Sequence, residues 1–410
     1  MKKLLLVLLI LSLFINHLNA NEKDLQIIQK DKKEYRLLDK ESIQTRQQSQ
    51  KYDWISPIDL SGNIGRNHSF SDENSRNLNN KNTKSASIGF TQSIFESGGI
   101  GFKMDYADNR FKYEMLSWEN QNSQLIYTIY NTLLDIKKLK LEIKQNEYRI
   151  VNKDIELIIK KIQYEAGKTD IIELNNAIMS KNLILKEEIA LKNSLKEKEQ
   201  ELAKYTDLKY DEIEILDFQE TNKDIFLDKN YSILEADAKV EMLNSEYKIK
   251  KSQYLPKLSL SAKASYSNQD EKFNSMINDT NKDDATSSGS LILSMPLYDY
   301  TKSSKIQESK IEVLKQKALV NDLKNETAFE YEQIFTKIDT YLKQNETINK
   351  NIKLYEELIG ANQISSEAGM TSKYDLEILE NTKTINEFDI LINKINILQQ
   401  YAKLYFKIKN

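Results

Sequence analysis

The sequence contains no cysteine, three prolines, ten glycines and two histidines among its 410 residues. Without cysteine, the chain can form no disulfide, no thiolate metal site and no cysteine nucleophile. Average usage would give a chain of this length roughly 29 glycines and roughly 20 prolines. The shortage of these turn-forming residues predicts a few long elements. The mean hydropathy of −0.61 excludes a polytopic helical membrane protein.

One apolar run stands at the start of the sequence. Lys2 and Lys3 precede a twelve-residue apolar segment, and a small residue, Ala20, closes a cleavage-site pattern. A run of this length is too short for a helix that spans a bilayer, which needs about 20 residues. We therefore expect residues 1–20 to be a signal peptide. The formal net charge of −3 argues against nucleic-acid binding as the main role.

Two segments of the chain repeat each other. QSIFESGG (92–99) resembles SMPLYDYT (294–301), and YEAGKTDIIEL (164–174) resembles SEAGMTSKYDL (366–376). Both pairs are offset by 202 positions, and Phe95 and Gly167 are 72 positions apart, as are Leu297 and Gly369. Equal spacing of two independent matches indicates an internal duplication. We expect a first repeat over 21–205 and a second over 229–410.

Each repeat opens with two segments in which apolar and polar residues alternate. This period of two predicts strands near 57–66, 85–95, 257–267 and 288–297. The segments between the paired strands, 67–84 and 267–287, are rich in Asn, Asp and Ser and predict long solvated loops. Strands of about ten residues would cross a hydrocarbon layer when tilted. Taken alone, however, the strands favour an ordinary soluble hairpin with one wet face.

Long helices follow each strand pair. Apolar residues recur at spacings of three, four and seven without proline, which predicts helices near 102–164 and 302–366. Shorter helices are predicted near 21–51, 170–205, 229–254 and 372–407, and their lengths would provide lateral partners for the two long ones. From the lengths, we expect 170–205 and 229–254 to line the first long helix, and the C-terminal helix to abut the N-terminal one. A small midpoint domain is expected at 206–228.

These features together resemble the outer-membrane factor family, the TolC-like channels of efflux pumps and type I secretion systems. The signal, the YLPKLSLSA segment (254–262), the segments after each strand pair and the two EAGxT turns carry the resemblance. The fold class it implies is α+β, mainly α, with a trimeric 12-stranded transmembrane β-barrel continuous with a periplasmic α-helical barrel. It also implies a passive duct in the outer membrane, extending into the periplasm of a Gram-negative bacterium. The implied partners are two further copies, a periplasmic adaptor protein, an inner-membrane pump and outer-membrane lipid.

The two EAGxT turns are the candidate functional site. The resemblance places a gate and the adaptor contact at this end, and Asp375 falls on the family's first aperture acid. Ile378 stands where a second acid would be, so Glu377 is the nearby substitute, and Glu173 is the matching acid of the first repeat. Read from the residues alone, Asp170-x-x-Glu173 and Ser372-x-x-Asp375 are capping boxes. The expected tip residues are Gly167, Lys168, Thr169, Gly369, Met370 and Thr371.

No motif for catalysis, a metal or a cofactor is present in the sequence, so we expect neither an enzyme nor a bound cofactor. Two other protein classes fit part of the pattern. A periplasmic adaptor would show one long helical hairpin within a β-rich chain, and a secreted coiled-coil scaffold would not need four alternating strands. Both alternatives would lack channel activity.

Overall fold

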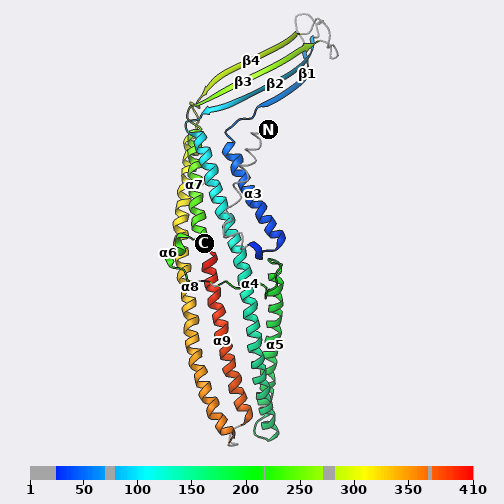
Figure 1. Ribbon diagram of the computed structural model, residues 1–410, viewed down its shortest axis with the longest axis vertical. Coiled ribbons are helices and arrows are strands. Elements are labelled where there is room, and N and C mark those ends of the chain that lie inside the picture. Colours follow the sequence, from blue (N-terminus) through cyan, green and yellow to red (C-terminus); the bar gives the residue numbers. More distant parts are fainter. Residues whose placement is uncertain are drawn as a thin grey trace, which may run out of the picture. The chain divides into compact units, whose positions relative to one another are not determined.

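The computed structural model describes residues 25–69, 79–216, 218, 220–270, 282–367 and 372–409. The chain is mostly helical with a small antiparallel sheet, as the sequence predicts (Figure 1). The expected signal peptide and three of the expected tip residues, Gly369, Met370 and Thr371, lie outside the described residues. The elements in order are η2 (Leu25–Ile27), α3 (Lys30–Tyr52), β1 (Asp59–Ser69), β2 (Asn79–Phe95), α4 (Gly99–Glu165), α5 (Ile171–Leu202), α6 (Lys223–Asp228), α7 (Tyr231–Ser252), β3 (Lys257–Asp270), β4 (Lys282–Ser294), α8 (Lys302–Glu367) and α9 (Lys373–Phe406).

The two longest helices, α4 and α8, have 67 and 66 residues. Neither contains proline, so no backbone N–H is missing along their length. Helix α4 begins three residues before the predicted start at 102. Ser97 and Gly98 adopt positive φ angles of 52° and 87° in the preceding turn, and the N–H of Gly99 then donates to the carbonyl of Glu96 at 2.9 Å.

The described residues fall into two compact units. Unit 1 takes its residues from Met1–Lys40, Leu116–Leu234 and Asn321–Asn410, and unit 2 from Glu41–Met115 and Glu235–Val320. Each unit contains residues of both sequence repeats. Helices α3, α4, α7 and α8 contribute residues to both units.

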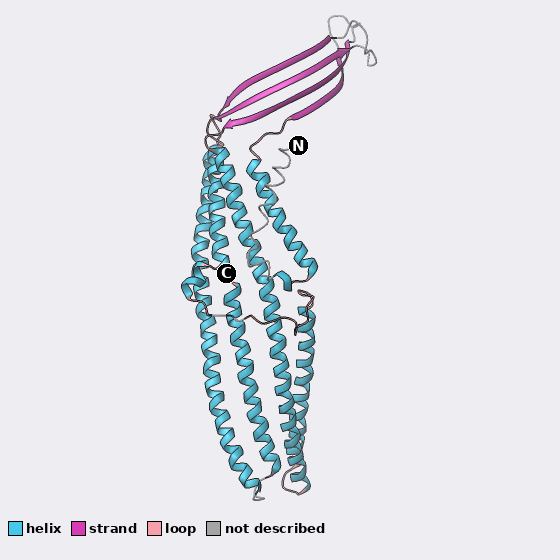
Figure 2. Cartoon of the chain, viewed as in Figure 1, coloured by secondary structure: helices cyan, strands magenta, loops and turns pink. Residues whose placement is uncertain are grey.

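Unit 2 contains the sheet, which has the order β1-β2-β3-β4 with every neighbouring pair antiparallel (Figure 2). The register sets the apolar positions of the strands on one face, because Leu60 lies opposite Ile88, and Ile88 opposite Ala264. Pairing of β2 with β3 joins the two predicted hairpins into one sheet. The strands also reach into the segments predicted as loops, since backbone pairing accepts polar side chains on both faces.

The helical part of unit 2 has the order α3, α4, α7, α8. Arg46 of α3 pairs with Glu114 of α4 at 2.9 Å. On the other flank of α4, Asn109 donates to Ser245 of α7 at 3.0 Å. Helix α7 then contacts α8, where Gln316 donates to the carbonyl of Ala236 at 3.4 Å.

In unit 1, four helices lie side by side in the order α5, α4, α9, α8 (Figure 1). Apolar residues of α4, α8 and α9 form its core, in which Phe226 of α6 is fully buried against Ile334 and Leu404. Phe226 belongs to the segment 206–228, which is expected to form a midpoint domain, and it packs into the core of unit 1. Phe218 of the same segment is buried as well and contacts Tyr130 and Phe406. The apolar residues of the segment therefore complete the core.

The helix partners differ from those that the helix lengths suggest. Helix α9 meets α7, not the N-terminal helix: Tyr231 N–H donates to the carbonyl of Lys407 at 3.0 Å. Helix α3 begins instead where α5 ends, and Gln29 N–H donates to the carbonyl of Tyr205 at 2.8 Å. The physical reason is that the two pairings are nearly equal in length. Helices α5 and α3 have 32 and 23 residues, and α9 and α7 have 34 and 22, so backbone hydrogen bonds at the breaks decide between them.

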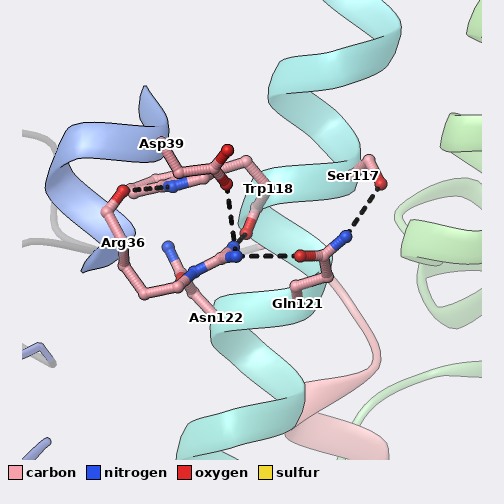
Figure 3. Close-up of polar contacts among 6 residues, drawn as sticks. All are labelled: Arg36, Asp39, Ser117, Trp118, Gln121 and Asn122. Atoms are coloured by element: carbon pink, nitrogen blue, oxygen red, sulfur yellow. Dashed lines mark hydrogen bonds and ion pairs between the residues drawn. The ribbon is translucent and has the colours of Figure 1, made fainter. Parts of the chain in front are cut away.

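The start of α3 is fixed to α4 by Arg36, which is 9% exposed (Figure 3). Its guanidinium donates from Nε to Asn122 Oδ1 at 2.6 Å, from Nη1 to Gln121 Oε1 at 2.8 Å and from Nη2 to the carbonyl of Trp118 at 2.9 Å. The indole N–H of Trp118 donates in return to the carbonyl of Arg36 at 2.8 Å. A buried guanidinium needs such a set of acceptors, since its desolvation is costly.

Candidate gate and docking site at the helix tips

The turn from α4 to α5 is built on Gly167. Its φ angle is +66°, a conformation that costs a residue with a Cβ about 1–2 kcal/mol. Gly167 N–H donates to the carbonyl of Tyr164 at 3.0 Å, and Lys168 N–H donates to the carbonyl of Gln163 at 2.8 Å. This pair of bonds is the Schellman motif, which ends a helix at a glycine. The turn leaves Lys168 exposed and Thr169 half-buried.

Asp170 caps the N-terminus of α5. Its Oδ1 accepts a hydrogen bond from the N–H of Glu173 at 3.0 Å, which is one half of the predicted capping box. The Glu173 carboxylate does not complete the box, because it accepts from Lys160 Nζ at 2.9 Å. The ion pair joins the last turns of α4 to the first turn of α5. Glu173 thus has a structural partner in the exposed tip of its hairpin.

Helix α9 begins at the second turn. Ser372 is its N-cap, and its hydroxyl accepts from the N–H of Tyr374 at 3.2 Å. The N–H of Asp375 donates to the Ser372 carbonyl at 3.0 Å, so the Ser372 hydroxyl bonds one position earlier than the predicted box requires. An acid in the first turn suits the positive end of the helix dipole, and Asp375 occupies that position.

The two candidate gate acids of the second repeat lie on different faces of α9. Asp375 and Glu377 are both exposed, but residues two positions apart in an α-helix project about 200° apart. Asp375 shares its face with Ile378 and Thr382, at spacings of three and seven. The two acids therefore do not form one cluster within a chain, and they need to be tested separately.

A polar seam joins α4 to α9, and its hydrogen-bonding residues were not predicted from the sequence. Gln145 Nε2 donates to Asp389 Oδ1 at 2.6 Å and to the carbonyl of Ile385 at 2.9 Å. Two helical turns nearer the tip, Asn152 Nδ2 donates to Thr382 Oγ1 at 3.3 Å. The Oδ1 atom of Asn152 accepts a hydrogen bond from Asn381 at 2.9 Å. The sequence does carry a signal for this seam. Polar residues stand seven positions apart within the apolar stripes of both helices, at 145 and 152 and at 382 and 389.

Charged contacts also fasten the end of α9. Glu330 of α8 accepts from Lys403 at 2.8 Å and forms a second, short ion pair with Lys407. Burial works to raise the pKa of Glu330, but the hydrogen bonds from the two lysines outweigh it, and the pKa lies below its usual value. The pair is therefore ionised at neutral pH and ties α8 to α9.

Within the described part of the chain, no three His, Asp or Glu side chains converge as they would around a metal ion. Among the same residues, no helix combines the length and the apolar character that crossing a membrane requires. The described surface instead offers helix ends, interhelical polar contacts and a sheet with an exposed apolar face.

Comparison with known structures finds the same fold in outer-membrane channels. The outer membrane channel CmeC of Campylobacter jejuni aligns with a TM-score of 0.70 at 12% identity, over 92% of this chain and 84% of that chain. VceC of Vibrio cholerae aligns with a TM-score of 0.69 at 14% identity, over 93% and 94% of the two chains. The open state of the MtrE channel of Neisseria gonorrhoeae gives 0.68 at 11% identity, over 94% and 87%. No curated protein sequence matches the chain at a significant level.

A protein-family model matches part of the sequence directly. The model is described as outer membrane efflux protein and covers residues 224–403, which include α7, the β3–β4 hairpin, α8 and most of α9. The resemblance to TolC-like channels drawn from the sequence is thereby confirmed. The family and the solved relatives are channels, not enzymes. Residues 224–403 thus match the model of the outer membrane efflux protein family, and the chain as a whole has the fold of solved outer-membrane channels.

Proposed function

We propose that this protein is a passive outer-membrane exit channel of a tripartite efflux pump or a type I secretion system. Three copies would form a 12-stranded barrel in the outer membrane, and their helices would form a tunnel into the periplasm. The cargo would be handed over by an inner-membrane pump and a periplasmic adaptor. The observation that carries the proposal is the β1–β4 sheet, which has one apolar exposed face and two open edges.

The apolar face of the sheet supports contact with lipid. Leu60, Leu291 and Leu293 are 80%, 67% and 73% exposed, and the register sets all three on the same face. The opposite face carries small hydroxyl residues, among them Ser61 and Ser87, whose side chains lie 2.8 Å apart. Apolar residues outside and small polar residues inside are the pattern of strands that enclose a wet passage in a membrane.

The edges of the sheet support assembly from several copies. Strands β1 and β4 each pair with a single neighbour in the described sheet. Their outer backbone groups would be unsatisfied in lipid, where only closed barrels are stable. Four strands are too few to close alone, because transmembrane barrels have eight strands or more. The number of three copies follows from the resemblance.

The outer helices of unit 1 support the same assembly. Helix α5 exposes Ile172, Met179 and Leu183 by 63%, 61% and 66%. Helix α8, at the other end of the row, exposes Leu354 and Leu358 by 56% and 48%. Apolar stripes on both outer helices suit head-to-tail contact between copies, which closes into a ring. Each stripe would then be buried against the next copy.

The tips of the two helical hairpins are the proposed gate and adaptor contact. Asp375 lies in the first turn of α9, and no described residue pairs with its carboxylate, so three copies could bring three such acids together around an aperture. Glu377 projects from a different face of α9 and is the second candidate acid. Glu173 is engaged by Lys160 and has the smaller expected effect on passage. Lys168 and Thr169 would offer the α4–α5 tip to the adaptor, and Gly369, Met370 and Thr371 the second tip.

Single-channel conductance in planar bilayers tests the gate. We expect Asp375→Ala to raise the conductance of the closed channel and to lower its cation selectivity, because a ring of negative charge would be removed. Glu377→Ala tests the other face of α9 separately from Asp375. Glu173→Ala is the matched control in the first repeat. Unchanged conductance and selectivity in all three variants would leave these acids with helix-end roles and contradict the gate.

Fractionation of the cell envelope tests the channel itself. We expect the protein in the outer-membrane fraction, and a mass of three copies after solubilisation in detergent. A species that stays in the periplasm without detergent would instead favour the adaptor or scaffold alternatives. Pull-down of the adaptor with wild-type protein, but not with Lys168→Glu, would support the proposed docking tip.

A further inference from the structure

Exposed aromatic and apolar residues gather in unit 2, where β4 leads into α8. Leu297, Tyr298 and Tyr300 in this connection are 91%, 85% and 87% exposed. Tyrosine rings have an apolar body and a polar hydroxyl, and they gather at the boundary between the membrane and water. The three residues directly follow the exposed apolar face of β4, with Leu291 and Leu293.

A groove of about 740 Å³ runs beside these tyrosines along the first turns of α8. Tyr300 and Tyr247 of α7 flank it, and Lys302, Ile306, Lys310 and Leu314 line it in a row. The four α8 residues are spaced by four positions, so they form one ridge of the helix. Cationic and apolar side chains alternate along this ridge. A groove of this kind suits a ligand that is both anionic and amphiphilic.

The charge of the groove is positive. Its single acid, Asp299, accepts hydrogen bonds from the N–H and hydroxyl of Thr301 at 2.8 and 2.7 Å, and Lys305 lies 3.8 Å away. The ammonium group of Lys302 lies 5.4 Å from the centre of the Tyr254 ring. Among the described residues, neither Lys302 nor Lys310 has a carboxylate partner. Many lysines of unit 1, by contrast, are paired, such as Lys160 with Glu173 and Lys383 with Glu356.

We propose that this groove binds the phosphate headgroup of an anionic phospholipid at the inner surface of the membrane. Lys302 and Lys310 would contact the phosphate, while Tyr298 and Tyr300 lie at the level of the glycerol backbone. Charge complementarity and continuity with the apolar face of β4 select a lipid as the occupant. The inference rests on the proposed function, because it needs the sheet to lie in a membrane.

Lipid binding to the purified full chain tests the site. Native mass spectrometry of the detergent-solubilised protein would count bound phosphatidylglycerol, with phosphatidylcholine as the zwitterionic comparison. We expect the wild type to retain phosphatidylglycerol preferentially. The variant Lys302→Gln/Lys310→Gln should bind it more weakly, by about five-fold for each lysine removed. Lys337→Gln/Lys350→Gln removes two exposed charges from the same helix and should bind as the wild type does.

Three results would overturn the site. Equal retention of both lipids by the wild type would show that no headgroup is recognised. Competition by inorganic phosphate alone would show an anion site that does not need a lipid. The chain has no cysteine, so Lys310→Cys introduces a single thiol in the groove. In the lipid-free assembly this thiol should react with a water-soluble maleimide. Protection of the thiol from the maleimide would mean that another copy covers the groove.

The outcome is separable from that of the proposed function. Conductance of the Lys302→Gln/Lys310→Gln variant in phosphatidylcholine bilayers should equal that of the wild type, because neither lysine is among the proposed gate residues. If the variant loses lipid preference but conducts, both proposals stand. If the wild type conducts without any lipid preference, only the headgroup site fails.

Discussion

Asn230 and Ile408 form an isolated antiparallel bridge, although they come from opposite ends of the second repeat. Around it, Tyr231 N–H donates to Lys407 O at 3.0 Å and Lys409 N–H donates to Lys229 O at 2.8 Å. The bridge satisfies the backbone groups that α9 leaves open at its end and that α7 leaves open at its start. It fixes which helix ends meet within unit 1.

The Arg36 anchor should be a large contributor to the stability of unit 1. Arg36→Met leaves Asn122 Oδ1 and the Trp118 carbonyl without their buried donor, so we expect a loss of about 2–4 kcal/mol. Urea unfolding followed by tryptophan fluorescence in a Trp54→Phe background measures this, because Trp118 is then the single tryptophan. Arg46→Met is the control, since its ion pair with Glu114 is partly exposed and should cost below about 1 kcal/mol. Equal losses would contradict the anchor.

Glu330 should make stability depend on pH. Its pKa in the folded chain is lowered, so its contribution is present above the unfolded pKa of about 4.3 and is lost as the pH falls through the folded pKa. Glu330→Gln should reduce the stability at pH 7 by about 1–3 kcal/mol and flatten the acid side of the curve. This is tested by the melting temperatures of the wild type and the variant between about pH 3 and pH 7, a range that covers the titration of Glu330. Parallel curves would rule out the assignment.

Gly167 should tolerate a side chain poorly despite open space around it. No atom lies within 4 Å of an added Cβ, but φ is +66°, so Gly167→Ala should cost about 1 kcal/mol. Gly360 in α8 is the matched control, because its surroundings are also open and its φ is helical. Gly360→Ala should stabilise by about 0.5–1 kcal/mol. The two thermal shifts should have opposite signs, and a shared sign would refute the strain argument.

Gln145 and Asp389 should be energetically coupled across the seam. A hydrogen bond to a charged acceptor contributes about 1.5–3 kcal/mol, and this one joins α4 to α9 at 2.6 Å. A double-mutant cycle of Gln145→Ala and Asp389→Ala isolates the pair. The pair Lys343 and Asp339, within the exposed face of α8, provides a cycle with weak expected coupling. Additive effects at the seam would argue against its role in holding the two hairpins together.

Sequence periodicity determined the elements. Scarce glycine and proline, together with apolar residues at spacings of three and four, predicted the ends of α4 and α8 to within three residues. Such patterns are informative because helix formation depends on local geometry. The period of two found the strands for the same reason. Their ends were less predictable, since β2 continues to Asn79 and β3 to Asp270 through backbone pairing with neighbours. Gly167, an expected tip residue, lies in the turn that ends α4 and has a positive φ.

Contacts between distant residues were decided by the tertiary structure alone. Helix lengths suit two pairings almost equally, and only hydrogen bonds such as Gln29 to Tyr205 choose between them. Glu173 pairs with Lys160 rather than with its own N-cap, because a cation thirteen positions away folds back beside it. The acceptors of Arg36 come from another helix. The sequence by itself determined which segments are helix and strand, since that depends on neighbours in the chain, whereas packing decided which side chains meet.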